Sequence, residues 1–439
     1  MSNDSEDPQP GRSLRSRLSR NLSWTFASQL FISIAAVVTL FITARALGPA
    51  GLGILALVES FVRIVDLILR LEPWQAVIRY AIQAQHRGDT AAFLRLIKLS
   101  VLIDAAGGVL AGVVCMILAP FVAPLIGLPE GRGEEYIWLM AAGLFFSFRP
   151  TAIAVLRIFD RFDRLAWVDI ISALVRLLLT VVAWLAGLGI WAFLVILLVQ
   201  SLMDGLLAFA VALQELRKRG HHGALAAQGL AALRENPGFL RFLWNSNFNV
   251  ILRQSANRFD VLALGVMMSP AAVGIYQLGK RVMNRLTKLA GPLRQTVYPE
   301  LARLWDKGKI HKFNRLVLIF SGSMLLLQLV IAVPFMLNME SVIALLFGPA
   351  FAGAGPVMNI LLTSAIIFAS GVVLNPALLA MGKDRMLVRV TMLSTLLFAL
   401  SFVPFVHLWG VKGAAASNLI FNLSWTIGCM LAFRRTRRG

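Results

Sequence analysis

Two stretches, "LGPAGLGILAL" at residues 47–57 and "MSPAAVGIYQL" at residues 268–278, carry the same pattern of proline, glycine and leucine 221 residues apart (270 − 49). Other landmarks keep this spacing along the chain. The aligned pairs are Pro49 and Pro270, Gly53 and Gly274, Leu57 and Leu278, Gly127 and Gly348, Asp163 and Asp384, and Gly189 and Gly410. A fixed period of this kind is the signature of a duplicated structural unit. The sequence therefore predicts two similar halves.

The composition is that of a membrane protein. Of the 439 residues 58% are hydrophobic and only 15% are charged, against roughly 25% charged residues in soluble domains, and the mean hydropathy is +0.76. Apolar runs of 18 or more residues recur, and each is long enough to cross a hydrocarbon core of about 30 Å as a helix. The composition excludes an ordinary soluble domain and predicts an all-α integral membrane protein.

Twelve transmembrane helices are predicted, six in each half. We expect spans near residues 24–44, 52–70, 99–126, 136–158, 165–187, 190–213, 241–267, 273–298, 315–337, 354–380, 386–407 and 410–433. The predicted organisation is a cytoplasmic tail at 1–23, a six-helix lobe at 24–213, a cytoplasmic linker at 214–240, a second six-helix lobe at 241–433 and a basic tail at 434–439. Because six is even, the halves have the same orientation, as in transporters with parallel repeats. We expect two pseudo-symmetric lobes around a central cavity.

The excess of 42 Lys and Arg over 22 Asp and Glu follows the predicted topology. Basic loops alternate with weakly charged ones, so the positive-inside rule places the basic loops and both termini in the cytoplasm. Nucleic-acid binding is not indicated, because the cations are spread over membrane loops. The two cysteines and five histidines show no spacing typical of metal ligands, so neither a metal nor a cofactor is expected.

The stretches "ARALGPAGLGILAL" (44–57) and "LRQTVYPELARLWDKGKIHKFNRL" (293–316), together with the duplication and the basic linker, resemble the polysaccharide-unit flippases of the multidrug/oligosaccharidyl-lipid/polysaccharide exporter superfamily. The resemblance implies a two-lobed, V-shaped transporter that carries undecaprenyl-pyrophosphate-linked oligosaccharide from the inner to the outer leaflet of a bacterial plasma membrane. It also implies a role in O-antigen or exopolysaccharide biosynthesis, with glycosyltransferases and a polymerase as partners. Lipid II flippases look similar but usually carry two further helices, which this sequence lacks.

Within the predicted eighth span, the stretch at residues 279–288 carries four cations, Lys280, Arg281, Arg285 and Lys288, and no Asp or Glu occurs from 261 to 299. A charge at the bilayer centre costs about 2.5 to 3.5 kcal/mol, so these groups must face water or anions. Three of them, Arg281, Arg285 and Lys288, are spaced i, i+4, i+7 and share one helix face. Because Arg binds phosphate oxygens bidentately and Lys adds a point charge, we expect this face to line the cavity and hold a diphosphate.

The seventh and second spans carry further polar stripes. The seventh has Ser246, Asn249, Arg253 and Asn257 at helical spacing with Arg258 beside them, and we expect these residues to bind the pyrophosphate and sugar. The second has Glu59, Arg63, Asp66 and Arg70 as an alternating ladder. The groups assigned to ion coupling or to charge balance are Glu59, Arg63, Asp66 and Asp260.

An alternative left open by the sequence is that the cations pair with acids of other helices. Candidate acids are Glu59, Asp66, Asp104, Asp169 and Asp204, although Asp169 with Arg176 and Gln200 with Asp204 are expected to be structural pairs. Two other functions compete with the flippase. An ion-coupled drug antiporter of the same fold should present carboxylates to its cationic cargo. A membrane-embedded polysaccharide polymerase or ligase should carry a sizeable outer domain, and the predicted outer loops are short. We therefore expect a secondary-type transporter rather than an enzyme.

Overall fold

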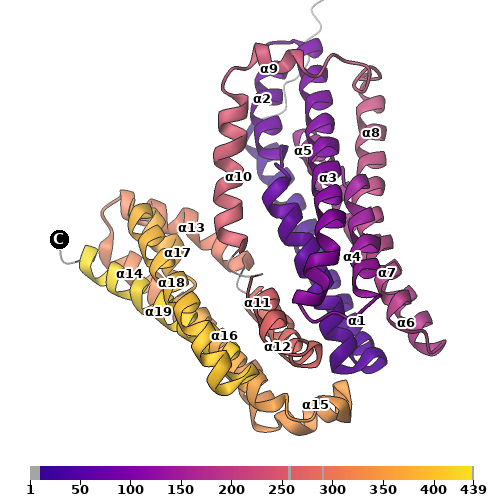
Figure 1. Cartoon of the computed structure of the whole chain (residues 1–439). Helices are drawn as coiled ribbons and strands as arrows, with labels where there is room; N and C mark the ends of the chain where they lie inside the picture. The colour runs from indigo at the N-terminus through magenta and orange to yellow at the C-terminus, as the bar shows by residue number, and fades with distance from the viewer. Residues whose placement is uncertain (1–9, 256–258, 289–290, 438–439) are drawn as a thin grey trace, which may run out of the picture. The chain divides into compact units, whose positions relative to one another are not determined.

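The computed structural model describes residues 10–255, 259–288 and 291–437, and within them the side chains other than those of 10–28, 249–250, 252–255, 288, 291–296 and 436–437. All regular structure in these ranges is helical (Figure 1). The elements are α1 Pro10–Leu69, α2 Trp74–His86, α3 Thr90–Leu125, α4 Gly133–Ala142, η1 Gly143–Phe146, α5 Arg149–Ile158, α6 Phe162–Leu185, α7 Ile190–Leu202, η2 Met203–Leu207, α8 Ala208–Lys218, α9 Ala231–Glu235, α10 Phe239–Ser255, α11 Phe259–Met267, α12 Pro270–Lys288, α13 Gly291–Asp306, α14 Ile310–Leu337, α15 Met339–Phe347, η3 Pro349–Phe351, α16 Gly355–Gly371, α17 Leu374–Ala380, α18 Asp384–Trp409 and α19 Val411–Arg437.

Helix α1 contains two predicted spans joined at a kink. Gly48 has φ 64° and ψ −173°, a conformation that is easily reached only by glycine. Pro49 then opens the second segment, where a missing N–H is tolerated because the first turn of a helix has no intrahelical acceptor for it. The glycine and proline of the repeated motif therefore end one helix and begin the next.

The helix boundaries repeat with the spacing of the sequence motif. Helix α7 begins at Ile190 and α19 at Val411, 221 residues later. Helices α2 and α13, α5 and α17, and α6 and α18 correspond approximately, because their starts are 217 (291 − 74), 225 (374 − 149) and 222 (384 − 162) residues apart. The aligned turn glycines Gly127 and Gly348 both have positive φ, 72° and 90°. The duplication inferred from the sequence is thus confirmed at the level of local structure.

The contacts divide the chain into two compact units whose limits interleave in the sequence. The first unit is Met1–Thr39, Phe61–Ala123 and Pro129–Ser255, and the second is Leu40–Ser60, Pro124–Leu128 and Ala256–Gly439. The second unit therefore includes the repeated motif from both halves of the chain.

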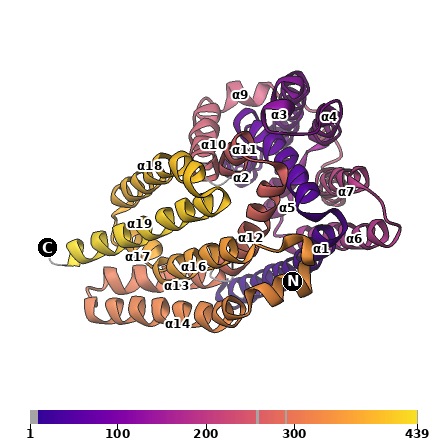
Figure 2. The same ribbon diagram turned by 60° about the horizontal axis from the view of Figure 1, so that its bottom comes forward.

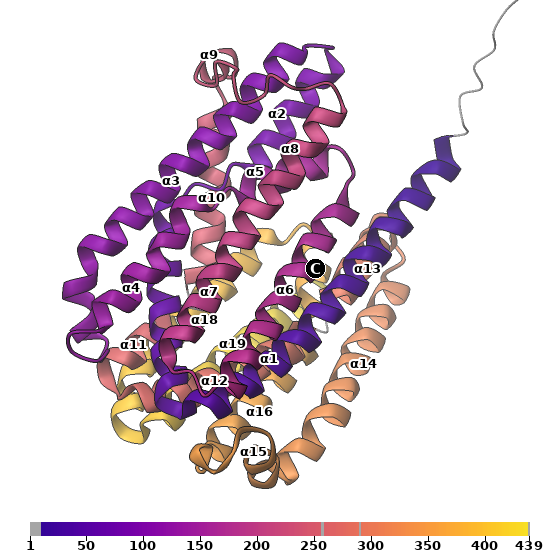
Figure 3. The ribbon, with the colours of Figure 1, turned by 90° about the vertical axis from the view of Figure 1, so that its right-hand side faces the viewer.

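In the first unit, α2, α5 and α8 run side by side, with α9 across their ends (Figures 1 and 3). Their core joins Phe93 and Leu96 of α3, Val155 of α5 and Phe239 of α10, all buried. In the second unit α16 lies between α14 and α19, and α18 covers the other side of α19 (Figure 2). Three of its buried polar residues, Ser364, Asn418 and Asn422, form one hydrogen-bonded cluster.

Nine helices of the described residues are long and apolar enough to cross a membrane. Their large apolar side chains face outward, for example Phe121 at 72% and Leu185 at 75% exposure. Such exposure is expected where lipid is the solvent. The chain is therefore an all-α, multi-pass membrane protein. One of the nine, Gln29–Leu69, contains two predicted spans. The seventh and eighth predicted spans fall on α10 to α13. The number of twelve spans stays a prediction.

Candidate functional site

The second segment of α1 and helix α12 cross at the repeated glycines. A Cβ added to Gly53 would lie 1.7 Å from the carbonyl oxygen of Pro270, and one added to Gly274 would lie 1.9 Å from that of Pro49. The two backbones are thus in direct contact, and each glycine meets the proline of the other copy of the motif. Small residues permit this close approach of membrane helices. The crossing positions the charged part of α12 beside α1.

Lys280 lies immediately after this crossing and is buried. Its ammonium group donates to both carboxylate oxygens of Asp260 on α11, at 2.6 Å to Oδ1. The hydroxyl of Tyr276 donates to Asp260 Oδ2 at 2.7 Å, and the backbone N–H of Val261 donates to Oδ1 at 2.8 Å. The charge of Lys280 is therefore neutralised inside the unit by Asp260, one of the acids assigned to ion coupling or to charge balance. Sequence reasoning missed Tyr276; its spacing of one turn from Lys280 was the available signal.

We expect the Lys280→Met variant to lose about 3 to 5 kcal/mol of stability, because it leaves the Asp260 carboxylate buried without its counter-ion. The double variant Asp260→Asn with Lys280→Met should recover most of that loss. Thermal unfolding of both variants in detergent micelles is the measurement. Equal stability of wild type and Lys280→Met, with transport lost, would contradict the structural role and return Lys280 to the substrate site.

Arg281 forms the next contact between the two helices. Its Nη2 donates to Oε2 of Glu59 at 3.0 Å, and the two side chains are 23% and 24% exposed. Glu59 stands six residues after Gly53 on α1, as Arg281 stands seven after Gly274 on α12. An acid from the other half of the chain thus balances this arginine, as the alternative interpretation of the sequence allowed.

Arg285 lies one turn further along the same face of α12 and is half-buried. Among the side chains that the structure describes, none forms a hydrogen bond or an ion pair with it. The nearest charge on its own helix face is the like charge of Arg281. A half-buried guanidinium with no carboxylate beside it can bind an external anion, most favourably a phosphate group with which it makes two parallel hydrogen bonds.

The other predicted ligands are less fully placed. Ser246 lies half-buried on α10, in the first unit. The side chains of Asn249, Arg253 and Lys288, and the whole of Asn257 and Arg258, lie outside the described residues. That these groups bind the same headgroup as Arg281 and Arg285 stays a prediction.

The ladder on α1 is used in two different ways. At its far end Arg70 pairs with Asp66 at 2.9 Å and donates to Ser147 Oγ at 2.6 Å and to the Leu144 carbonyl. Glu59, at its near end, contacts Arg281 on α12. The Asp66–Arg70 step pairs as the i, i+4 spacing predicts.

The expected structural pairs of the first unit have different partners from those predicted. Asp169 pairs with Arg149 at 2.8 Å rather than with Arg176, and Arg176 donates to Gln200 at 2.7 Å. Asp204 accepts from Ser172 and lies 3.7 Å from Arg149. The prediction failed because a π-helical turn at Met203–Leu207 adds a residue to the turn and shifts the direction of Asp204.

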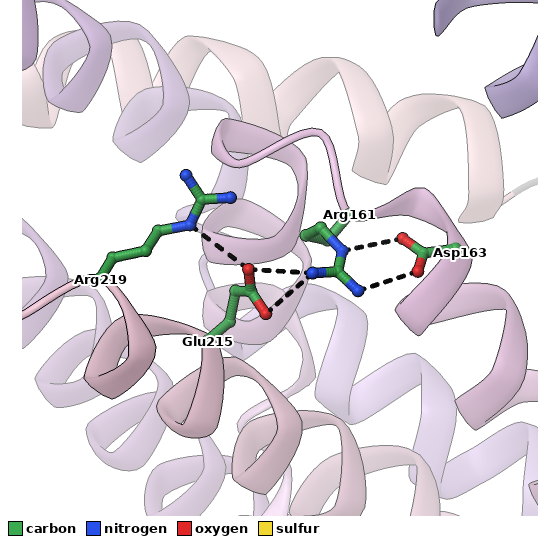
Figure 4. A network of polar contacts seen from close by, with 4 residues as sticks. All are labelled: Arg161, Asp163, Glu215 and Arg219. Carbon is green, nitrogen blue, oxygen red and sulfur yellow. Dashed lines mark hydrogen bonds and ion pairs between the residues drawn. The ribbon is translucent and has the colours of Figure 1, made fainter.

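A separate network joins the ends of α5, α6 and α8 (Figure 4). Arg161 donates two hydrogen bonds to Asp163, both at 3.0 Å, and also contacts Glu215, to which Arg219 donates at 3.3 Å. These hydrogen bonds, first those to Asp163, raise the pKa of Arg161. The network clamps three helix ends in a loop that we predicted to be cytoplasmic, and its acids and arginines balance one another, so we assign it a structural role.

A duplicated, multi-pass membrane protein with a buried ion pair and half-buried arginines near the crossing of its repeats has the architecture of membrane transporters with parallel repeats. Residues 18–305 match the model of the family described as "Polysaccharide biosynthesis protein". Because this match covers more than half of the chain, the protein belongs to that family, and the resemblance drawn from its motifs is confirmed.

Two relatives and one solved structure illustrate the similarity. The inner membrane protein YghQ of Escherichia coli is 26% identical over 290 residues, which cover 65% of this chain and 80% of YghQ. The probable flippase AglR of Haloferax volcanii is 25% identical over 44% of this chain and 40% of its own. The structure of the lipid II flippase MurJ in an inward closed conformation matches with a TM-score of 0.72 and 12% identity, over 94% of this chain and 86% of MurJ. The last match establishes the fold.

Proposed function

We propose that this protein is a flippase that moves an oligosaccharide linked to undecaprenyl pyrophosphate from the inner to the outer leaflet of a bacterial plasma membrane. The proposal includes cytoplasmic termini, the two six-helix lobes at 24–213 and 241–433, and alternating access between them. The glycosyltransferases that assemble the substrate and the polymerase that consumes it are the proposed partners. Membership of a polysaccharide biosynthesis family and the similarity to a probable flippase support this function.

The observation that carries the proposal is the environment of Arg285. Among the described residues it has no acid partner, and it follows Arg281 on one face of α12. Two adjacent arginines present up to ten N–H donors in two planar forks, which suits the several oxygens of a diphosphate. The proposed role of Lys280 is different: it stabilises the fold through Asp260. Lys288, Arg253, Arg258 and the amides of Asn249 and Asn257 remain proposed ligands of the headgroup.

The same observation argues against an exporter of cationic drugs. Such an exporter places carboxylates where its cargo binds, whereas the face of α12 offers guanidinium groups that repel cations. An anionic headgroup is attracted to the same face.

The function is tested by mass spectrometry of lipid-linked oligosaccharides in membranes of a strain that lacks this protein, together with its surface polysaccharide. We expect undecaprenyl-pyrophosphate sugars to accumulate and the surface polymer to be lost, because the substrate is made but not translocated. The mass of the accumulated species also identifies the sugar. Unchanged lipid intermediates together with unchanged polymer would overturn the flippase proposal.

A further inference from the structure

The two ion pairs of α12 differ in how easily they open. The Lys280–Asp260 pair is buried, and its carboxylate also accepts from Tyr276 and from the backbone. Breaking it would leave an uncompensated buried charge, which costs several kcal/mol. The Glu59–Arg281 pair is about a quarter exposed and has one hydrogen bond at 3.0 Å. Because this pair is less buried than the Lys280–Asp260 pair, a competing anion can displace it at a smaller cost.

The two copies of the repeat carry different residues at the positions that form this ion pair. Glu59 is equivalent to Lys280 (280 − 59 = 221), and Ser60 is equivalent to Arg281. The first copy of the repeat therefore supplies an acid where the second supplies cations, and the close crossing at Gly53 and Gly274 places them together. The Glu59 carboxylate therefore contacts Arg281, which lies one turn before the half-buried Arg285 on the same face of α12.

We propose that Glu59 is a displaceable counter-ion: it holds Arg281 while the protein is empty and yields to the diphosphate of the substrate. This inference rests on the proposed function and specifies how that site distinguishes its ligand. A diphosphate displaces Glu59 because it offers several charged oxygens to Arg281 and Arg285 together, whereas the Glu59 carboxylate accepts a hydrogen bond from Arg281. A ligand with a single weak anionic group lacks this advantage.

Displacement of Glu59 would link the binding of the substrate to the contact between the two repeats. Besides the glycine crossing, the Glu59–Arg281 hydrogen bond is a side-chain tie between α1 and α12. When the substrate takes Arg281, that tie opens.

The test uses the purified full-length protein and inorganic pyrophosphate as the probe, with affinity measured by isothermal titration calorimetry in the absence of divalent cations. Glu59→Gln should bind pyrophosphate about threefold to fivefold more tightly than wild type, because a competing ion pair of up to about 1 kcal/mol is removed. Arg281→Gln should bind at least about tenfold more weakly. In the Arg281→Gln background, Glu59→Gln should add nothing. Arg303→Gln, which removes an exposed arginine paired with Glu300, is the matched control and should bind as wild type does.

The exchanged variant Glu59→Arg with Arg281→Glu separates the two possible roles. If the pair only ties the two helices, the exchanged variant keeps this tie. In that case Glu59→Gln leaves the affinity for pyrophosphate unchanged or lowers it, and this result would overturn the inference. If Glu59 is a counter-ion, the exchanged variant keeps the thermal stability of wild type and loses affinity for pyrophosphate. Failure of the wild type itself to bind pyrophosphate would overturn the diphosphate site as well, so the two failures are distinguishable.

Discussion

Replacing Gly53 by alanine is expected to abolish transport and to reduce sharply the yield of folded protein. The new methyl carbon would lie 1.7 Å from the carbonyl oxygen of Pro270, more than 1 Å inside the distance that such atoms tolerate. The obstacle is backbone, so no side-chain rotation relieves it, and α1 and α12 must separate. Separation also lengthens the Glu59–Arg281 contact and moves the proposed anion site. Gly274→Ala, with its clash at 1.9 Å against Pro49, should behave alike.

The matched control is Gly322→Ala. Gly322 also lies inside a helix, α14, but a Cβ added there meets nothing within 4 Å. Because alanine is favoured over glycine by about 0.5 to 1 kcal/mol in a helix interior, this variant should be neutral or slightly more stable. Size-exclusion chromatography of detergent extracts measures folded yield, and complementation of the deletion strain measures transport. Wild-type behaviour of Gly53→Ala would show that the helices do not cross at this glycine.

The double variant Arg281→Ala with Arg285→Ala is expected to lose transport while remaining folded and inserted in the membrane. Hydrogen bonds to charged groups contribute about 1.5 to 3 kcal/mol each, so loss of both arginines should slow translocation by at least about a hundredfold. Stability should change little, since Arg285 has no partner among the described side chains and the ion pair of Arg281 with Glu59 is about a quarter exposed. Accumulated lipid-linked oligosaccharide in the complemented deletion strain is the measurement. Normal transport by the double variant would remove the pyrophosphate assignment.

The two arginine positions should also differ from each other. Arg281→Ala releases Glu59 and removes one ligand, whereas Arg285→Ala removes a ligand without freeing an acid. If Glu59 acts as the counter-ion of Arg281, adding Glu59→Gln to Arg281→Ala should leave transport unchanged, whereas adding it to Arg285→Ala should restore part of the lost transport, because Arg281 is then released to bind the headgroup.

The sequence by itself determined the membrane class and the duplication, and both follow from local physics. Runs of apolar residues must leave water wherever they occur in the chain, and a repeat of 221 residues preserves the same turns in each copy, as the positive φ of Gly127 and Gly348 shows. Helical periodicity likewise sufficed to place Arg281 and Arg285 on one face.

Only the tertiary structure decided which charges meet. Periodicity relates residues a few positions apart, but Glu59 and Arg281 are 222 residues apart, and their pairing depends on two backbones touching at Gly53 and Gly274. The sequence grouped Lys280 with the other cations of the eighth span, and the fold buries it against Asp260. A π-helical turn, invisible to a 3.6-residue pattern, changed the partner of Asp204. The Glu59–Arg281 pair is a property of a helix crossing, which forms between segments far apart in the chain.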